Sequence, residues 1–290
     1  KLSDGRFTLG LGTQVRGHIR RRYGMNWSPP GPWMRDYVGA VRAIWHAWQH
    51  AEPLNYESEH YQLSLLVPLF TPAPIAHPDI PVHLAAINPN LCAVAGEVAD
   101  GVRPHPVCTS SYISEVMLPA VAKGAARAGR SVEHFQVAHK PLIATAPTPE
   151  MLEERVRDVR ARVAFYVSTP AYRAAFSHHG LGELADEMAT LSRQQRWEEM
   201  PGLITDDILH TFATVGTWDE IGDLLRERYE GVVTSLEFSI AVKTQADAEV
   251  MTKLIDQLSS SPSPVERADP ATSGPAQGRG RWSQPRGGHK

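Results

Sequence analysis

The sequence IPVHLAAI at residues 80–87 is an apolar run with little alternation between apolar and polar positions. Such a run is typical of a strand that is buried on both faces of a parallel sheet. We expect a helix at residues 90–99 and the next, shorter strand at residues 101–106. A strand, a helix and a second strand in this order predict a βαβ unit, the building block of parallel β/α folds.

The same alternation continues on both sides of this unit. Predicted strands cover residues 7–11, 80–87, 101–106, 135–145 and 232–242. Predicted helices follow residues 29–32, cover residues 90–99, 111–127, 149–166 and 246–258, and begin once more at Thr217. At least five such units favour a parallel β/α architecture over a sandwich or a helical bundle. A closed barrel of this kind takes eight units and about 250 residues, so residues 1–258 are expected to form an incomplete barrel.

Local signals mark further boundaries. Gly129 stands where a helix should stop, and Thr217 followed by Glu220 predicts a capping box. The buried face of the first helix is predicted from apolar positions at helical spacing, which are Tyr37, Val41, Ile44, Trp45 and Trp48.

Four segments are expected to lie outside the repeating units. They are a hairpin at residues 56–66, a proline-rich loop at residues 68–81, a helical excursion at residues 170–209 and a tail at residues 259–290. The tail is rich in Ser, Pro, Gly and Arg. It has little apolar surface to bury, so disorder is expected.

The composition limits the classes of function. The 290 residues are 42% hydrophobic and 21% charged, which suits a soluble globular chain. A net charge of -3 argues against binding to nucleic acid or to an acidic membrane, since both need a dominant basic surface. Two cysteines and the lack of an apolar run of about 20 residues favour a reduced, cytoplasmic protein. No metal is expected, because only His105 and Cys108 have a ligand-like spacing and a site needs three or four ligands.

The first predicted strand ends in a candidate ligand site. Gly10, Gly12 and Thr13 would let a ligand approach the backbone closely, although a tight turn explains the glycines equally well. His18 lies just beyond, where barrel enzymes build their active sites, but a lone loop histidine is more often a surface residue. A cluster of arginines could meet a phosphate or a polyanionic cofactor tail, or form a solvated, salt-bridged loop; it comprises Arg16, Arg20, Arg21 and Arg22.

A second candidate site follows the strand at residues 80–87. Ala86, Ile87 and Asn88 precede a helix, whose N-terminal N–H groups form a natural anion site. Helix capping by the Asn88 side chain is a compatible structural explanation. His178 and His179 lie in the helical excursion and are interpreted as surface residues, because the sequence identifies no partner for them.

Several segments together resemble one known family. They are LSDGRFTLGLGTQV (residues 2–15), RDYVGAVRAIW (35–45), PVHLAAINPN (81–90), AGEVADGVRPHP (95–106), FYVSTPAYR (165–173) and FATVGTWDEI (212–221). In their order and spacing they resemble the luciferase-like monooxygenase family, in particular its actinobacterial, deazaflavin-dependent members. The first segment is similar to the fourth barrel strand of that family, so strands one to three are expected to be missing from this chain.

The resemblance implies an α/β fold, a (β/α)8 barrel of the luciferase-like type that is incomplete here. It implies that the cofactor is the deazaflavin coenzyme F-420, or alternatively FMN, bound at the carboxyl ends of the strands. Thr13, Gln14, Val15 and His18 would then border the ring and the ribityl chain, and Ala86, Ile87 and Asn88 would contact the ribityl and phosphate portion.

The activity that the resemblance implies is that of an oxidoreductase or monooxygenase. Hydride transfer or oxygen insertion would act on a small organic molecule, with the substrate unidentified and no catalytic residue assigned. Two alternatives stay open, namely a noncatalytic ligand-binding or subunit-interaction relative and an inactive gene fragment. A homodimer is one of the oligomeric states left open.

Overall fold

The main sheet has five parallel strands in chain order. The computed structural model describes residues 2–238, 240 and 242–259. The strands are β1 (Leu9–Leu11), β4 (Val82–Ala86), β5 (Gly101–Pro104), β6 (Gln136–His139) and β9 (Ser235–Leu236), in the order β1-β4-β5-β6-β9. This confirms five parallel strands with the first and the last predicted strand at the two edges.

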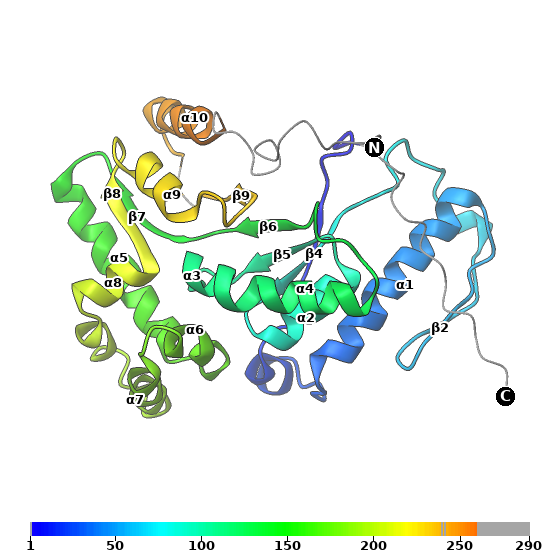
Figure 1. The fold of residues 1–290 in the computed structure, drawn as a ribbon, viewed down its shortest axis with the longest axis horizontal. Coiled ribbons are helices and arrows are strands. Elements are labelled where there is room, and N and C mark those ends of the chain that lie inside the picture. Colours follow the sequence, from blue (N-terminus) through cyan, green and yellow to red (C-terminus); the bar gives the residue numbers. More distant parts are fainter. Residues whose placement is uncertain (1, 239, 241, 260–290) are drawn as a thin grey trace.

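The main helices are α1 (Pro30–His50), α2 (Pro89–Val98), α4 (Leu118–Arg127), α5 (Pro149–Val167), α9 (Ile221–Tyr229) and α10 (Gln245–Ser259). Figure 1 shows α1, α2 and α4 on one face of the main sheet. Along β4, Val82, Leu84 and Ala86 join the hydrophobic core under these helices, whereas Ala85 is exposed on the opposite face. The sheet is therefore covered by helices on one face.

The packing of α2 against α4 depends on two glycines. A Cβ atom added at Gly96 would lie 2.0 Å from the carbonyl oxygen of Val121, and one added at Gly124 would lie 1.9 Å from that of Ala93. Real atoms do not approach so closely. Both positions thus require glycine, since only its missing side chain lets the two helix backbones touch.

The predicted strand at residues 135–145 is in fact two strands. β6 ends at His139, and β7 (Leu142–Ala146) begins after Pro141 and pairs in parallel with β8 (Ala213–Thr217) in a separate sheet. Proline has no N–H to donate to a ladder, so it separates the two strands. β8 was not predicted, and the last strand is much shorter than the predicted residues 232–242.

The helical excursion and the hairpin are confirmed. The excursion contains a 3-10 turn (Pro170–Tyr172), α6 (Arg173–Ser177), α7 (Gly182–Arg193), a second 3-10 turn (Met200–Leu203) and α8 (Asp206–Phe212). β2 (Tyr56–Glu57) and β3 (Gln62–Leu63) form the antiparallel hairpin. Within the described part of the chain, every helix is too short or too polar to cross a membrane. The tail predicted to be disordered begins at Ser259, which is in fact the last residue of α10, and residues 260–290 lie outside the described residues.

The predicted helix at residues 111–127 is interrupted by one π turn. α3 (Ser110–Tyr112) continues through the π turn at Ile113–Met117 into α4. Gly129 has a φ of 64° and ends the helix, as predicted. Such bulges inside helices are frequent at functional sites.

The capping box at Thr217 and Glu220 is only half formed. The Glu220 carboxylate accepts the N–H of Thr217 at 2.8 Å, but the Thr217 hydroxyl donates to the same carboxylate at 2.7 Å. The hydroxyl therefore does not accept the backbone N–H that a full capping box requires. Helix α9 begins at Ile221, four residues after the predicted start.

The predicted buried face of α1 is confirmed only in part, because Val41, Ile44, Trp45 and Trp48 are half-buried and Tyr37 is exposed. The buried side chains are Met34, Val38, Ala40 and Ala47, whereas Tyr37 is 40% exposed. Of the predicted set, Trp45 packs against the core while half-buried. The β2/β3 hairpin packs on the other side of α1. The sequence pattern assigned the residues on that side to the buried core.

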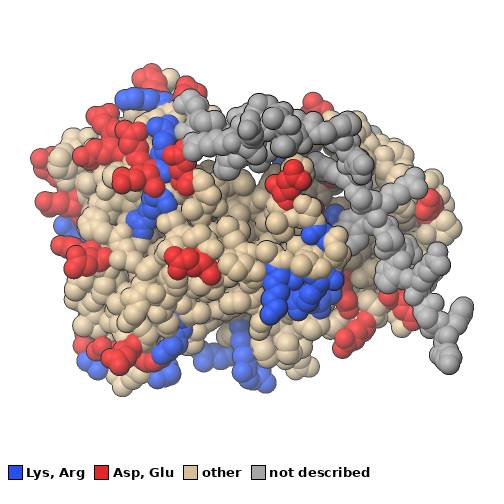
Figure 2. Space-filling view, in the orientation of Figure 1, with Lys and Arg blue, Asp and Glu red and all other residues tan. Residues whose placement is uncertain are grey.

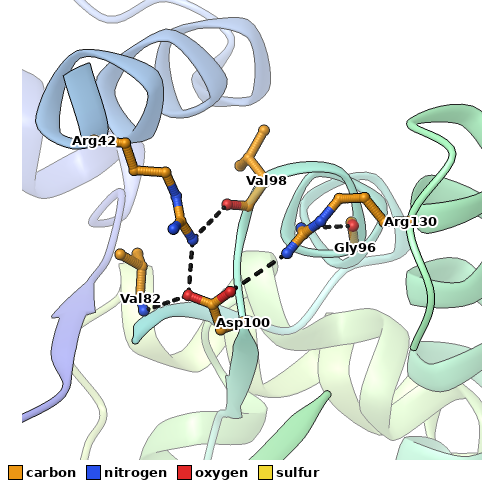
Figure 3. A network of polar contacts seen from close by, with 6 residues as sticks. All are labelled: Arg42, Val82, Gly96, Val98, Asp100 and Arg130. Carbon is orange, nitrogen blue, oxygen red and sulfur yellow. Dashed lines mark hydrogen bonds and ion pairs between the residues drawn. The ribbon is translucent and has the colours of Figure 1, made fainter. Parts of the chain in front are cut away.

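Polar contacts around Asp100 close the amino-terminal edge of the sheet (Figure 3). Its carboxylate accepts the Val82 N–H at 2.9 Å, the Arg42 guanidinium at 2.7 Å and the Arg130 guanidinium at 3.4 Å. Both arginines also donate to carbonyls at the carboxyl end of α2. Asp100 thus ties α1, α2, β4 and the segment after α4 together. In parallel β/α folds, ligands are expected at the other edge, where the strands have their carboxyl ends.

Candidate functional site

The carboxyl ends of β1, β4 and β5 meet at one edge of the main sheet. Leu11 pairs with Leu84, and Ala86 pairs with Pro104. Continuing this register places Thr13 beside Ala86, and His105 beside Ile87. The two predicted candidate sites, at the ends of β1 and β4, are therefore neighbours.

The face of the sheet opposite the helices is flat at this edge. Gly10, Gly12 and Ala85 are all exposed there. A Cβ atom added at Gly12 would lie 3.4 Å from that of Ala85. Side chains of one carbon or none leave room for a planar ring to lie against the strands. Beyond them, Arg103 forms an ion pair with Glu237 from the segment after β9.

The loop after β1 holds Thr13, Gln14, Val15 and His18 together. Gln14 has a φ of 56°, a left-handed conformation that is uncommon for a residue with a side chain and is often found at ligand sites. Its side-chain carbonyl lies 3.2 Å from Nδ1 of His18, and the Thr13 hydroxyl donates to the Gln14 carbonyl at 3.4 Å. Gln14 and His18 are exposed, while Thr13 and Val15 are half-buried.

Among the described residues, the arginine cluster in this loop has no salt-bridge partner. All four arginines are exposed, and among the described residues none has a carboxylate within 4.0 Å. Arg16 instead lies over the ring of Trp27 at 5.1 Å. Figure 2 shows basic side chains at the lower edge of the molecule, where Figure 1 draws this loop. Acidic side chains gather at the upper left, where Figure 1 draws α10. The predicted exposure of this loop to solvent is therefore confirmed, whereas the described residues form none of the predicted salt bridges.

Asn88 begins helix α2 without capping it through its side chain. Its backbone carbonyl accepts the N–H groups of Leu91 and Cys92, while its side-chain amide donates to the carbonyl of Ala171 at 3.1 Å. Pro89 contributes no N–H. The start of α2 therefore has fewer free donors for an anion than the sequence indicated. The Ile87 carbonyl accepts the Tyr112 hydroxyl at 3.0 Å, which fixes the end of β4.

An aromatic cluster that the sequence did not reveal stands beside these residues. The His105 ring lies 4.0 Å from that of Tyr172 and 4.7 Å, edge-on, from that of Tyr166. Burial lowers the pKa of His105 to about 4, so the imidazole is neutral at pH 7. Its Nδ1 accepts the Val107 N–H at 3.4 Å, which places the remaining proton on Nε2. The available signal was the segment FYVSTPAYR, which contains both tyrosines.

His178 and His179 are not surface residues. Both are half-buried. The His179 Nε2 lies 2.9 Å from the Thr109 hydroxyl, and the His178 Nε2 lies 3.3 Å from the Ser111 hydroxyl. These contacts connect the helical excursion to the start of α3. In the described part of the chain, no three His, Cys, Asp or Glu side chains are grouped so that they could hold a metal ion.

Comparisons with known proteins identify the fold. The sequence profile of the luciferase-like monooxygenases matches residues 1–235. An uncharacterized protein of Mycobacterium tuberculosis is 44% identical over 231 residues, which are 80% of this chain and 68% of that protein. A second protein of M. tuberculosis, which carries the name coenzyme F-420-dependent oxidoreductase, is 28% identical over 239 residues, or 76% of this chain and 66% of that protein. The coenzyme F-420-dependent tetrahydromethanopterin reductase of Methanopyrus kandleri has a similar structure, with a TM-score of 0.64 and 21% identity over 88% of this chain and 74% of that chain.

Proposed function

The chain belongs to the luciferase-like monooxygenase family, and from that membership we propose that it is an oxidoreductase that binds coenzyme F-420 across the ends of β1 and β4. The observation that carries the proposal is the flat, exposed surface of Gly10, Gly12 and Ala85 beside Thr13. A fused, planar ring fits such a surface because Gly10 and Gly12 have no side chain and that of Ala85 is one carbon; the Arg103 side chain, whose Cδ would lie 3.8 Å from a Cβ atom added at Gly10, borders the surface. This surface supports binding of the cofactor ring. The start of α2 supports binding of a phosphate less well, because it has fewer free N–H donors than the sequence indicated.

The loop after β1 suits the charged end of the same cofactor. Coenzyme F-420 and FMN both carry anionic groups, and the exposed arginines here lack carboxylate partners among the described residues. A guanidinium recognises phosphates and carboxylates through parallel N–H donors. These arginines directly follow Thr13 and Val15, so one ligand could contact the ring site and this loop.

When bound, the deazaflavin supplies hydride transfer, which is chemistry of the cofactor rather than of the side chains. The chain contributes positions and contacts. We propose that Thr13 and Gln14 border the ring, that His18 orients Gln14, and that Ala86 and Ile87 contact the ribityl chain through their backbone groups. Asn88 would fix the segment around Ala171 over the site.

The relatives support deazaflavin over FMN. The oxidoreductase of M. tuberculosis and the reductase of M. kandleri are both named for coenzyme F-420. Side chains at the edge of the sheet do not distinguish the two rings. We therefore propose coenzyme F-420 as the cofactor and keep FMN as the competing ligand in the experiment.

Calorimetric titration of the 290-residue chain with coenzyme F-420 and, separately, with FMN tests the proposal. We expect binding of coenzyme F-420 with micromolar affinity or better. Thr13→Val keeps the branched shape and removes only the hydroxyl, so a ligand hydrogen bond there should be worth about 0.5 to 1.5 kcal/mol of binding free energy. Thr252→Val, at an exposed position on α10, is the matched control. Tighter binding of FMN than of coenzyme F-420 would identify FMN as the cofactor. Failure of both ligands to bind would refute the proposal.

A further inference from the structure

The aromatic cluster of His105, Tyr166 and Tyr172 has hydrogen-bonding groups that the fold does not use. Within the described residues, the Nε2 of His105 and both phenol hydroxyls have no hydrogen-bond partner. None of the three atoms is among the buried atoms that lack partners, so all of them reach solvent. All three residues are half-buried. Each of these three neighbouring rings thus keeps one polar group that water or a ligand can reach.

The cluster stands next to the ring site of the proposed cofactor. His105 directly follows the last residue of β5, and the register of β4 and β5 places it beside Ile87. Tyr172 follows Ala171, whose carbonyl is held by the side chain of Asn88. The fold therefore connects the cluster to the cofactor site by one strand pairing and one hydrogen bond.

The cluster is electrically neutral. Burial alone lowers the pKa of His105, with no contribution from a nearby carboxylate or guanidinium. Burial also raises the pKa of Tyr172, which keeps its hydroxyl protonated. A charged ligand group would lose its hydration there without gaining an opposite charge, which is strongly unfavourable. A neutral oxygen would lose less and would gain hydrogen bonds from these donors.

We propose that His105, Tyr166 and Tyr172 bind the uncharged oxygen group of an organic substrate, a carbonyl or a hydroxyl, beside the cofactor ring. That this molecule is the substrate of a redox reaction rests on the proposed function. The binding site itself rests on the cluster. The two tyrosine rings add apolar surface, which favours a substrate that carries an apolar ring beside its oxygen. Carboxylates and phosphates are excluded from this position.

Acetophenone and benzoate are suitable probes, because both have a phenyl ring and a carbonyl oxygen and only benzoate is charged. Binding to the 290-residue chain without cofactor can be followed by NMR, through the imidazole C–H signals of His105. We expect saturable binding of acetophenone, with an affinity at least tenfold above that of benzoate. Equal affinities, or no shift of the His105 signals, would overturn the proposal.

Single-atom variants test the hydroxyls. Tyr166→Phe and Tyr172→Phe keep each ring and remove one oxygen, and each should weaken acetophenone binding two- to tenfold, the range of one hydrogen bond. Tyr37→Phe, on the exposed side of α1, is the matched control and should change nothing. If neither variant of the cluster differs from this control, the donors do not bind the ligand and the inference is wrong.

The same variants separate this inference from the proposed function. Tyr172→Phe should leave the affinity for coenzyme F-420 within twofold, since the phenol is assigned to the substrate. If the chain binds acetophenone through these tyrosines but binds no cofactor, the proposed function fails and the binding site stands. If it binds coenzyme F-420 and is indifferent to acetophenone, the inference alone fails.

Discussion

Replacing Gly124 by alanine should destabilise the chain strongly, against the usual effect of this substitution. In the interior of a helix, alanine is normally about 1 kcal/mol more favourable than glycine. Here the new Cβ would lie 1.9 Å from the carbonyl oxygen of Ala93. Ordinary contact begins at 3.4 Å, so α2 and α4 would have to separate by more than 1 Å, and overpacking of this kind costs about 1 to 3 kcal/mol. The clash is with backbone, which cannot rotate away, so we expect the upper end of that range.

The measurement is urea unfolding followed by circular dichroism. Gly202→Ala is the control, because an added Cβ there meets nothing within 4 Å. We expect the free energy of unfolding to fall by about 2 to 3 kcal/mol for Gly124→Ala and to stay within about 0.5 kcal/mol for the control. The separation would also displace α3, which continues into α4, and hence Tyr112 and the end of β4. Equal stability of the two variants would refute the account of this helix pair.

Three further predictions concern charge and protonation. Asp100→Asn keeps the shape of the side chain but weakens its contacts with two arginines. Because the side chain is 35% exposed, we expect the free energy of unfolding to fall by about 1 kcal/mol. An unchanged urea midpoint would show that these contacts do not stabilise the fold. The double change Arg20→Gln and Arg21→Gln should weaken coenzyme F-420 binding roughly three- to tenfold at low salt and much less at about 1 M salt. The control, Arg155→Gln with Arg157→Gln on α5, should leave the affinity unchanged. A loss of affinity that does not depend on salt would point to damage of the loop. His139 is fully buried, and burial lowers its pKa to about 4. Between pH 6.5 and 4 the unfolded chain therefore binds the extra proton, and the free energy of unfolding falls as the pH falls, by up to roughly 3 kcal/mol. His139→Phe should flatten this slope in urea unfolding, and an unaltered slope would assign the pH dependence to other groups.

The repeating part of the fold could be predicted from the sequence because each strand is locally consistent. The run at residues 80–87 is apolar throughout, and its strand was found within a few residues of the expected bounds. β8 was missed for the opposite reason. Its sequence ATVGT contains a glycine and two threonines, and it is a strand only because β7 pairs with it. Pairing with a distant strand is not visible in the local pattern.

Helix faces were predicted less well than helix positions. α1 was expected to bury Tyr37, but the β2/β3 hairpin contacts that side, and the ring of Tyr61 lies 6.0 Å from that of Tyr37. The Trp33 indole donates to the Tyr61 hydroxyl at 2.6 Å, and the Tyr56 hydroxyl donates to the Asp36 carbonyl at 3.0 Å. A helix that packs on a sheet and on a hairpin has two contact faces, so a single apolar stripe does not identify its core.

The residues of the candidate site also form two groups, one that the sequence could locate and one that it could not. Residues after β1 and β4 could be located from the sequence, since parallel strands end at a common edge and each strand end was followed by glycine or a helix start. His105, Tyr166 and Tyr172 could not be grouped, because 61 or more positions of sequence separate the histidine from the tyrosines. Tyr166 lies near the end of α5 and Tyr172 at the start of the helical excursion, which is fixed to the end of β4 and the start of α3 by contacts with Asn88 and Thr109. Residues that come from strand ends follow from topology, whereas residues on an inserted segment follow from how that segment packs. The site proposed for the cofactor ring therefore rests on topology, and the site proposed for the substrate rests on how α5 and the excursion pack.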